Sequence, residues 1–135
     1  MAIVGLGVDV VDVKRMDRAL AGPRGARFRE RVFTPAERAE CERHPVLCAQ
    51  RYASRFAAKE AVLKALGRRT RWGFAWREVE VTRDAASGAP AVVLRGRVAE
   101  RARALGAGRV LVSLSHESSV AVAQALAESA ASWVS

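Results

Sequence analysis

Two carboxylates and a lysine are the residues whose types and spacing suggest chemistry. Glu60 and Lys64 stand four positions apart, which is one turn of a helix, and Asp9 ends a strand-like segment near the N-terminus. A salt bridge within the helix would explain the Glu60–Lys64 pair by itself. Mg²⁺, however, takes one or two protein carboxylates and leaves its other positions to water and substrate phosphate. We therefore predict that Asp9 and Glu60 share one Mg²⁺, which the protein uses to move a phosphate-linked group.

The strand that positions Asp9 is predicted over residues 3–10. Its alternating pattern puts four aliphatic side chains on one face, and we expect this face to contact the core: Val4, Leu6, Val8 and Val10. The other face carries Gly5, Gly7 and Asp9. The two glycines are expected to keep that face open at its end.

The helix that positions Glu60 and Lys64 is predicted over residues 46–66, with Gly67 as its C-terminal stop. On a helical wheel one stripe is apolar and forms the expected core face: Tyr52, Phe56, Leu63 and Leu66. Three small residues lie beside Glu60 and Lys64: Ala53, Ala57 and Ala61. Because alanines occupy little space, we expect room for a ligand against this side of the helix.

Shorter elements complete the predicted fold. Asp12 is expected to cap a helix that reaches about Leu20, and residues 34–37 (Thr-Pro-Ala-Glu) form a capping box with proline at the first helical position. Further strands are predicted over 78–83, 91–95, 109–116 and 120–127, and a further helix over 98–105. This order predicts an α+β domain, with an antiparallel sheet packed against one long helix and several short helices. We expect a single domain over residues 1–127 and a flexible tail over 128–135.

The chain is basic, since 23 Lys and Arg against 14 Asp and Glu give a formal net charge of +9. Basic side chains concentrate between residues 14 and 31, which indicates a negatively charged partner: nucleic acid, phosphates or an acidic protein. No apolar run reaches the roughly 20 residues of a membrane helix. The N-terminus also lacks the features of a signal peptide, so we predict a cytoplasmic protein with no membrane partner.

The two cysteines, Cys41 and Cys48, have His44 between them. These three residues fall short of a structural zinc site, which needs four ligands and a closer cysteine pair. They are expected to be idle thiols of a reducing compartment.

The motifs exclude several other kinds of site. Residues 5–7 (Gly-Leu-Gly) lack the third glycine of a dinucleotide-binding fingerprint, and no GxxxxGK[ST] loop occurs. Ser115 and His116 do not suggest a serine hydrolase, because neighbouring strand residues point to opposite faces and no GxSxG motif is present. A non-catalytic basic module that binds RNA or another polyanion remains the alternative. Against it, the chain has few aromatic residues and no RNA-binding motif, and Asp9 and Glu60 would repel phosphate unless a metal lies between them.

Four blocks of sequence resemble the signature blocks of the 4′-phosphopantetheinyl transferases. They read Gly-Val-Asp at 7–9, Phe-Thr-Pro-Ala-Glu at 33–37, Arg-Phe-Ala-Ala-Lys-Glu-Ala-Val-Leu-Lys-Ala at 55–65 and Val-Ser-Leu-Ser-His at 112–116. Each block is modest alone, but together they follow the family's order and span the chain to about residue 127. The length resembles the small type, which modifies acyl carrier proteins, rather than the double-length type.

The resemblance implies a reaction. Coenzyme A would bind with Mg²⁺ on its pyrophosphate, and a serine hydroxyl of an apo-acyl carrier protein would attack the β-phosphorus, so that 3′,5′-ADP leaves. Asp9 and Glu60 would hold the metal. Glu60, or a metal-bound water that it orients, would accept the serine proton, and Lys64 would contact the phosphates and could carry the proton onward. The positions that match family contacts to the coenzyme are Arg55, Lys64, Gly67, Pro90, Ser115 and His116.

The resemblance also implies partners. Acyl carrier proteins are strongly acidic, and Arg15, Arg18 and Arg27 are expected to dock one, of fatty acid or polyketide type. Small members of the family form homotrimers with an active site at each subunit interface. Residues from two chains would then build each site.

Two departures from the family pattern bear on the site. Two positions after the metal aspartate the double-length type has another acid, whereas this chain has Val11, so a water is expected to take that place. Residues 68–73 (Arg-Arg-Thr-Arg-Trp-Gly) replace a glycine-rich turn. We expect Arg68 and Arg69 to contact the 3′-phosphate of the coenzyme. Thr34 and Glu37 are explained by the helix start and are not counted as catalytic.

Overall fold

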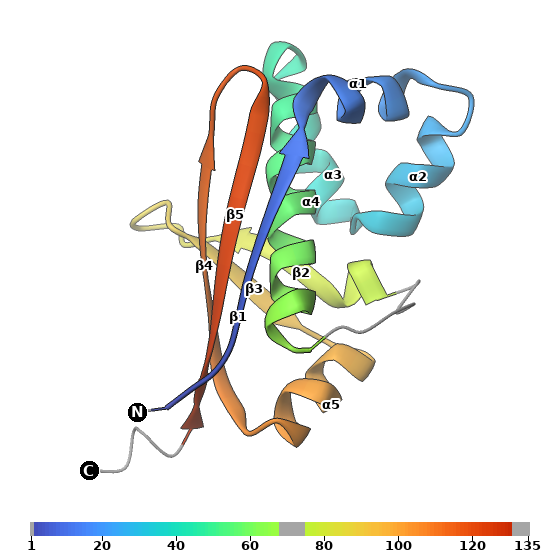
Figure 1. Cartoon of the computed structure of the whole chain (residues 1–135). Helices are drawn as coiled ribbons and strands as arrows, with labels where there is room; N and C mark the ends of the chain where they lie inside the picture. Colours follow the sequence, from blue (N-terminus) through green and yellow to red (C-terminus); the bar gives the residue numbers. More distant parts are fainter. Residues whose placement is uncertain (1, 68–74, 131–135) are drawn as a thin grey trace.

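A three-stranded antiparallel sheet carries all the helices on one of its faces (Figure 1). The computed structural model describes residues 2–67 and 75–130 of the chain. Its elements, in chain order, are β1 (Ile3–Asp12), α1 (Val13–Ala21), α2 (Gly25–Val32), α3 (Pro35–Glu42), a 3₁₀ turn (Pro45–Leu47), α4 (Cys48–Ala65), a second 3₁₀ turn (Ala75–Glu78), β2 (Val79–Arg83), β3 (Pro90–Leu94), α5 (Gly96–Ala104), β4 (Ala107–His116) and β5 (Val120–Ser129). The predicted α+β architecture is confirmed.

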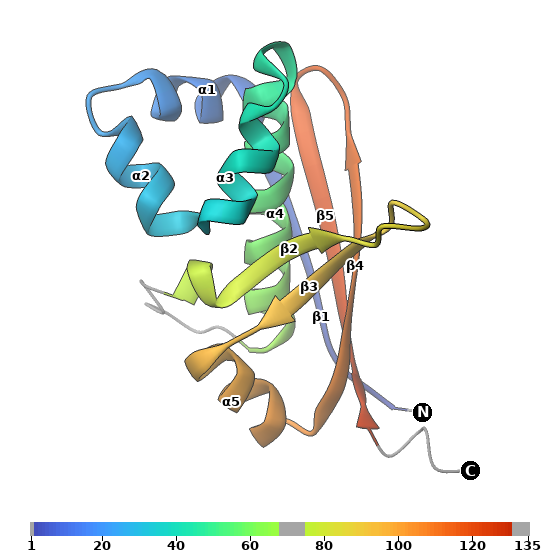
Figure 2. The same ribbon diagram turned by 180° about the vertical axis from the view of Figure 1, so that it is seen from behind.

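The sheet has the order β1-β5-β4, with β5 at its centre. Helix α4 packs along the inner face of β1 and β5, and the β2–β3 hairpin crosses α4 and reaches β4 at the edge of the sheet (Figure 2). The inner face of β5 is made of small residues that are fully or almost fully buried: Ala121, Ala123, Ala125 and Ala127. These alanines let the helix axis approach the sheet closely.

The prediction for the two faces of β1 holds for Val4, which packs against the core, but is wrong after the register shift between Ile3 and Gly5. Leu6, Val8 and Val10 are 54–62% exposed, so the aliphatic face points away from α4. The glycine face packs on the helix instead: a Cβ added at Gly5 would lie 1.8 Å from the Ala65 carbonyl oxygen, and one at Gly7 would lie 2.0 Å from the Ala61 carbonyl oxygen. Backbone contact with α4 therefore decides which face is inside, and only glycine permits that contact.

The prediction that the alanines of α4 leave room for a ligand is also wrong. Ala53, Ala57 and Ala61 are fully buried and belong to the clusters that α4 forms with the alanines of β5. Their small size serves the close packing of helix and sheet. The predicted core stripe of α4 is confirmed for Tyr52, Leu63 and Leu66, which are at most 1% exposed.

The helix starts predicted from capping residues are confirmed. The Asp12 carboxylate accepts hydrogen bonds from the amides of Lys14 and Arg15. At the start of α3, Thr34 and Glu37 form the full capping box. The long helix begins at Cys48 rather than at 46, because the Pro45–Leu47 turn precedes it.

The expected boundary of the C-terminal tail is too early. Strand β5 continues to Ser129, and Glu128 is 2% exposed because its carboxylate pairs with Arg109 at 2.6 Å. Residues 131–135 lie outside the described residues. Within 2–67 and 75–130, no helix combines the length and apolar character needed to span a membrane.

Candidate active site

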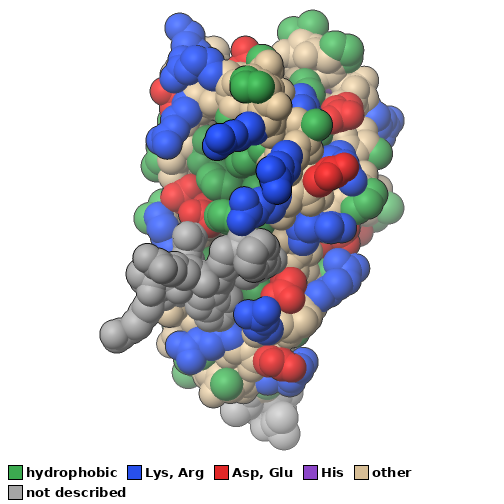
Figure 3. All heavy atoms as spheres, turned by 90° about the vertical axis from the view of Figure 1, so that its right-hand side faces the viewer, with side chains coloured by type: hydrophobic (Ala, Val, Ile, Leu, Met, Phe, Trp, Pro, Cys, Tyr) green, Lys and Arg blue, Asp and Glu red, His purple; other side chains and the backbone are tan. Residues whose placement is uncertain are grey.

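A pocket of about 380 Å³ lies where β1, α1, α2 and α4 meet. Its acidic lining residues are Asp9 and Asp12 of β1 and Glu60 of α4, and Arg15 of α1 lines it as well. Apolar residues form the rest: Val10, Val11, Met16, Ala19, Phe28 and Phe56. On the face drawn in Figure 3, apolar side chains are visible in a hollow with Lys and Arg side chains gathered around it. Asp9 and Glu60, from a strand and a helix far apart in the sequence, therefore border one cavity on a basic face.

Asp9 reaches the pocket because it shares the inner face of β1 with Gly5 and Gly7. Its Oδ1 accepts a hydrogen bond from Lys64 Nζ at 2.9 Å, and the same ammonium donates to the Val8 carbonyl at 3.0 Å. Lys64 thus joins α4 to β1 beside the pocket. An ammonium at this place can bind the oxygens of a phosphate as readily as a carboxylate.

Glu60 is held by a residue that the sequence reasoning missed. Trp76, in the 3₁₀ turn before β2, donates its indole N–H to Glu60 Oε2 at 2.8 Å. The two residues are 16 positions apart, and no spacing or motif links them. Only the tertiary structure reveals this contact.

The pocket suits a divalent ion that is shared with a substrate. Asp9 and Glu60 offer hard carboxylate oxygens, which Mg²⁺ prefers. Within residues 2–67 and 75–130, no group of three or more His, Cys, Asp or Glu side chains forms a complete metal site. Two carboxylates are nevertheless enough for Mg²⁺ when waters and substrate phosphates supply the other ligands. The residues present therefore fit the predicted ion.

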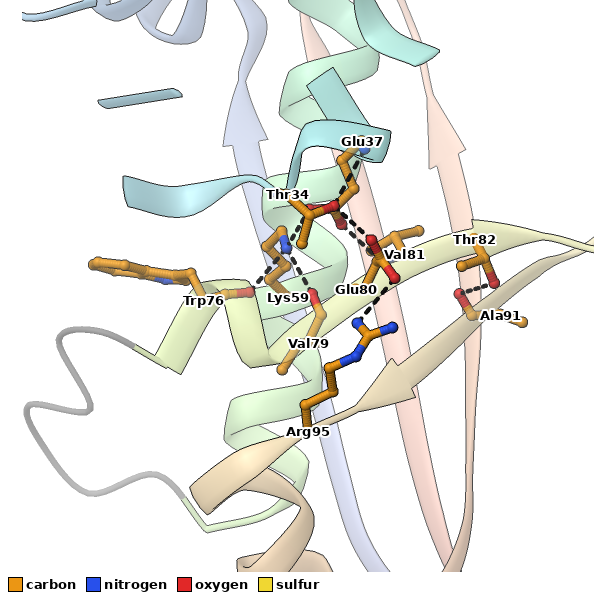
Figure 4. A network of polar contacts seen from close by, with 10 residues as sticks. All are labelled: Thr34, Glu37, Lys59, Trp76, Val79, Glu80, Val81, Thr82, Ala91 and Arg95. Atoms are coloured by element: carbon orange, nitrogen blue, oxygen red, sulfur yellow. Dashed lines mark hydrogen bonds and ion pairs between the residues drawn. The ribbon is translucent and has the colours of Figure 1, made fainter. Parts of the chain in front are cut away.

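A buried ion pair lies on another side of α4 (Figure 4). Lys59 is 0% exposed, and its Nζ lies 2.7 Å from Glu37 Oε1, 2.8 Å from the Trp76 carbonyl and 2.6 Å from the Val79 carbonyl. Burial lowers the pKa of Lys59, and the Glu37 carboxylate opposes that shift. The contacts of Lys59 connect α3, α4 and β2.

The residues predicted to bind the coenzyme do not meet in one chain. Arg55 is 3% exposed, on the side of α4 where its charge acts on Glu40 of α3. Gly67 follows the C-terminal end of α4, and Pro90 begins β3. Of the six predicted residues, Lys64 is the one that contacts Asp9.

Ser115 and His116 lie at the end of β4. In the sheet Ser115 is opposite Val122, whereas Asp9 is opposite Ala123, so the side chains of Ser115 and Asp9 emerge on opposite faces. His116 Nδ1 lies 2.8 Å from Gln50 Nε2. Ser115 therefore cannot share the Asp9 pocket within a single chain, and His116 is not among the residues that line it. The predicted contacts of Arg68 and Arg69 lie outside the described residues.

The residues predicted to dock the carrier protein lie on α1 and α2. Arg15, Arg18 and Arg27 are all exposed, and Arg15 also lines the pocket. The basic surface therefore begins at the mouth of the cavity that holds Asp9 and Glu60.

Comparison with known proteins identifies relatives over nearly the whole chain. The sequence profile of the 4′-phosphopantetheinyl transferase superfamily matches residues 5–123. The holo-[acyl-carrier-protein] synthase of Anaeromyxobacter dehalogenans (strain 2CP-1) is 52% identical over 128 residues, which cover 93% of this chain and 96% of that protein.

Solved structures agree with the sequence relatives. The crystal structure of holo-[acyl-carrier-protein] synthase from Neisseria meningitidis is similar with a TM-score of 0.83 and 32% identity, over 94% of this chain and 99% of that one. The structure of a holo-(acyl-carrier-protein) synthase from Bacillus anthracis in complex with CoA (3′,5′-ADP) gives a TM-score of 0.75 and 29% identity, over 95% and 98% of the two chains.

Proposed function

This chain belongs to the 4′-phosphopantetheinyl transferase superfamily, and we propose that it transfers 4′-phosphopantetheine from coenzyme A to a serine of an apo-acyl carrier protein. The observation that carries the proposal is the pocket in which Asp9 and Glu60 line one cavity with Arg15 at its side. Relatives named holo-[acyl-carrier-protein] synthase, one of them in complex with CoA (3′,5′-ADP), support the choice of substrates.

Asp9 and Glu60 are the residues that would hold Mg²⁺. When bound, the ion neutralises the negative charge that grows on the pyrophosphate of coenzyme A during transfer. Both residues line the cavity, and both are partly buried.

Glu60 and Lys64 would assist the transfer step itself. The hydroxyl oxygen of the carrier serine forms a bond to the β-phosphorus, the bridging P–O bond breaks, and 3′,5′-ADP leaves. The Glu60 carboxylate, or a water that it orients, accepts the serine proton. Lys64, whose ammonium lies 2.9 Å from Asp9 Oδ1, turns toward the phosphates and stabilises their charge.

We further propose a homotrimer with an active site at each subunit interface. The outer face of the sheet is aliphatic and uncovered, with Leu6, Val8, Val10 and Leu111 each more than 40% exposed. An uncovered apolar face of this kind is typical of a protein interface. Two subunits would also bring Ser115 and His116 of one chain to the pocket of another.

The carrier protein would dock on the basic surface of α1 and α2. Arg15, Arg18 and Arg27 are exposed there, and the whole chain has a net charge of +9. An acidic carrier would be steered to this surface, and its association would weaken as salt rises. We place the reaction in the cytoplasm, a proposal supported by the two free cysteines, Cys41 and Cys48.

The test is a mass measurement. The protein is incubated with coenzyme A, Mg²⁺ and an apo-acyl carrier protein, and the carrier is then weighed intact. A mass gain of one phosphopantetheine is expected. No gain with carriers of both fatty acid and polyketide type would reject the proposal and leave the binding of RNA or another polyanion as the alternative.

A further inference from the structure

Trp76 is held at two ends by adjacent residues of α4. Its backbone carbonyl accepts a hydrogen bond from Lys59 Nζ at 2.8 Å, and its indole N–H donates to Glu60 Oε2 at 2.8 Å. Residues 59 and 60 point about 100° apart around the helix axis. Helix α4 therefore binds Trp76 through the buried Lys59 ammonium and through the Glu60 carboxylate, which lines the pocket.

The Lys59 end of this interaction is fixed. An ammonium has three N–H donors, and Lys59 has three acceptors: Glu37 Oε1, the Trp76 carbonyl and the Val79 carbonyl. Glu37 is fixed in turn, because it accepts from the Thr34 amide at 2.8 Å and, through Oε2, from the Val81 amide at 2.7 Å. Figure 4 shows these bonds converging from α3, α4 and β2.

The indole ring is fixed by packing. It contacts both apolar clusters of the molecule, and its centroid lies 6.2 Å from that of Phe56 with the ring planes 37° apart. Phe56 lines the pocket. The indole N–H therefore approaches Glu60 from a defined direction.

We propose that Trp76 is a positioning residue for Glu60, and that the buried Lys59–Glu37 pair holds Trp76 in place for that purpose. A glutamate side chain has three rotatable bonds, and a hydrogen bond to one carboxylate oxygen restricts them. The inference rests on the proposed function, in which Glu60 holds Mg²⁺ and accepts the serine proton. The hydrogen-bond partner of a metal-binding carboxylate sets its orientation, and losing such a partner typically costs about 10- to 100-fold in metal affinity or activity.

The test compares Trp76→Phe with wild type. Phenylalanine keeps an aromatic ring against Phe56 but has no N–H to donate. We expect kcat to fall about 10-fold or more and the Mg²⁺ concentration for half-maximal rate to rise, while KM for the carrier protein and the Tm stay close to wild type. Trp133→Phe is the matched control, because it makes the same exchange beyond the residues that match the family. It should retain wild-type kinetics.

A second readout does not depend on turnover. The indole ¹H–¹⁵N resonance of Trp76 is identified by its disappearance in Trp76→Phe. It should shift in Glu60→Gln, and also when Mg²⁺ and coenzyme A are added to wild type, while the Trp133 resonance stays in place.

The outcomes separate the two proposals. Wild-type kcat and Mg²⁺ dependence in Trp76→Phe would overturn the inference. A fall in rate that only follows a loss of folded protein, with an unchanged Mg²⁺ response, would overturn it too, because Trp76 would then be merely structural. If wild type itself transfers no phosphopantetheine, the proposed function fails. The indole shift in Glu60→Gln would still report whether the contact exists.

Discussion

Gly7→Ala places a methyl group between β1 and α4. Gly7 lies two residues before Asp9, on the same face of the strand. The new Cβ would lie 2.0 Å from the Ala61 carbonyl oxygen and 2.8 Å from the Ala65 amide nitrogen. Ordinary contact begins at 3.4 Å. Both neighbours are backbone atoms of a helix, so no side chain can rotate away. The strand and the helix would have to separate by about 1.4 Å, which is the shortfall in that contact.

The size of the effect follows from this separation. Overpacking of this kind costs about 1–3 kcal/mol, which in a domain of this size lowers the Tm by roughly 5–12 °C. Activity should fall further than stability, because the shift moves Asp9 relative to Glu60. A misplacement of about 1 Å can reduce the rate by about 100-fold.

The assay measures the Tm and the rate of phosphopantetheine transfer for Gly7→Ala and for Gly22→Ala. Gly22 has a φ of −74°, and its added Cβ would come no closer than 3.2 Å to another atom, so it is the matched glycine control. We expect Gly22→Ala to remain close to wild type. If Gly7→Ala kept the wild-type Tm and rate, the close contact of β1 with α4 would not be what positions Asp9.

Three further changes test other parts of the structure. Val8→Glu puts a charge on the uncovered sheet face and should shift the oligomer toward monomer in light scattering, with loss of transfer activity. A hydrogen bond from Thr34 lowers the pKa of Glu80 below 4.5. The stability that the ionised Glu80 carboxylate contributes is therefore complete above pH 4.5, and it is lost as the pH falls through the pKa of Glu80 in the folded protein. The Tm of Glu80→Gln should therefore fall less steeply than that of wild type in acid. Lys59→Met should cost about 3–5 kcal/mol in urea unfolding, because Glu37 is left buried without its partner.

Each of these three variants has an outcome that would contradict the prediction, and Val8→Glu also has a control. Val93→Glu changes a valine of similar type, 40% exposed but on β3, and should leave the oligomer intact. A trimer that persists in Val8→Glu would contradict the proposed interface. Parallel acid profiles for wild type and Glu80→Gln would contradict the assigned pKa direction. A Lys59→Met protein as stable as wild type would show that the buried pair contributes little.

Most elements of the fold could be predicted because their signals are local. A capping box at 34–37, a capping aspartate at 12 and helical periodicity after residue 46 each depend on neighbours within a few positions. The predicted strands agree with the observed ones to within a few residues. Local chemistry is enough to decide such elements.

The faces of β1 could not be predicted from local chemistry. Alternation shows that the strand has an aliphatic face and a glycine face, but the approach of α4 decides which is inside. Gly5 and Gly7 allow that approach, and the aliphatic face is left for another surface. A single sequence contains no direct sign of that second surface.

The site could be predicted only in part. Asp9, Glu60 and Lys64 came from residue types and helical spacing, and the structure brings them together at one pocket or beside it. Trp76 was missed because its contact with Glu60 depends on how the chain returns to α4 before β2. The residues expected at the coenzyme lie apart in one chain, since no intrachain packing gathers them.

The most direct test of the account is the transfer rate of Asp9→Ala and Glu60→Ala with saturating coenzyme A and carrier protein, measured across a Mg²⁺ titration. Each variant is expected to stay folded but to lose activity by orders of magnitude, and chelating Mg²⁺ should stop wild type as well. Near-normal turnover in either variant, or transfer that continues without a divalent ion, would contradict the assignment of these two carboxylates to one Mg²⁺.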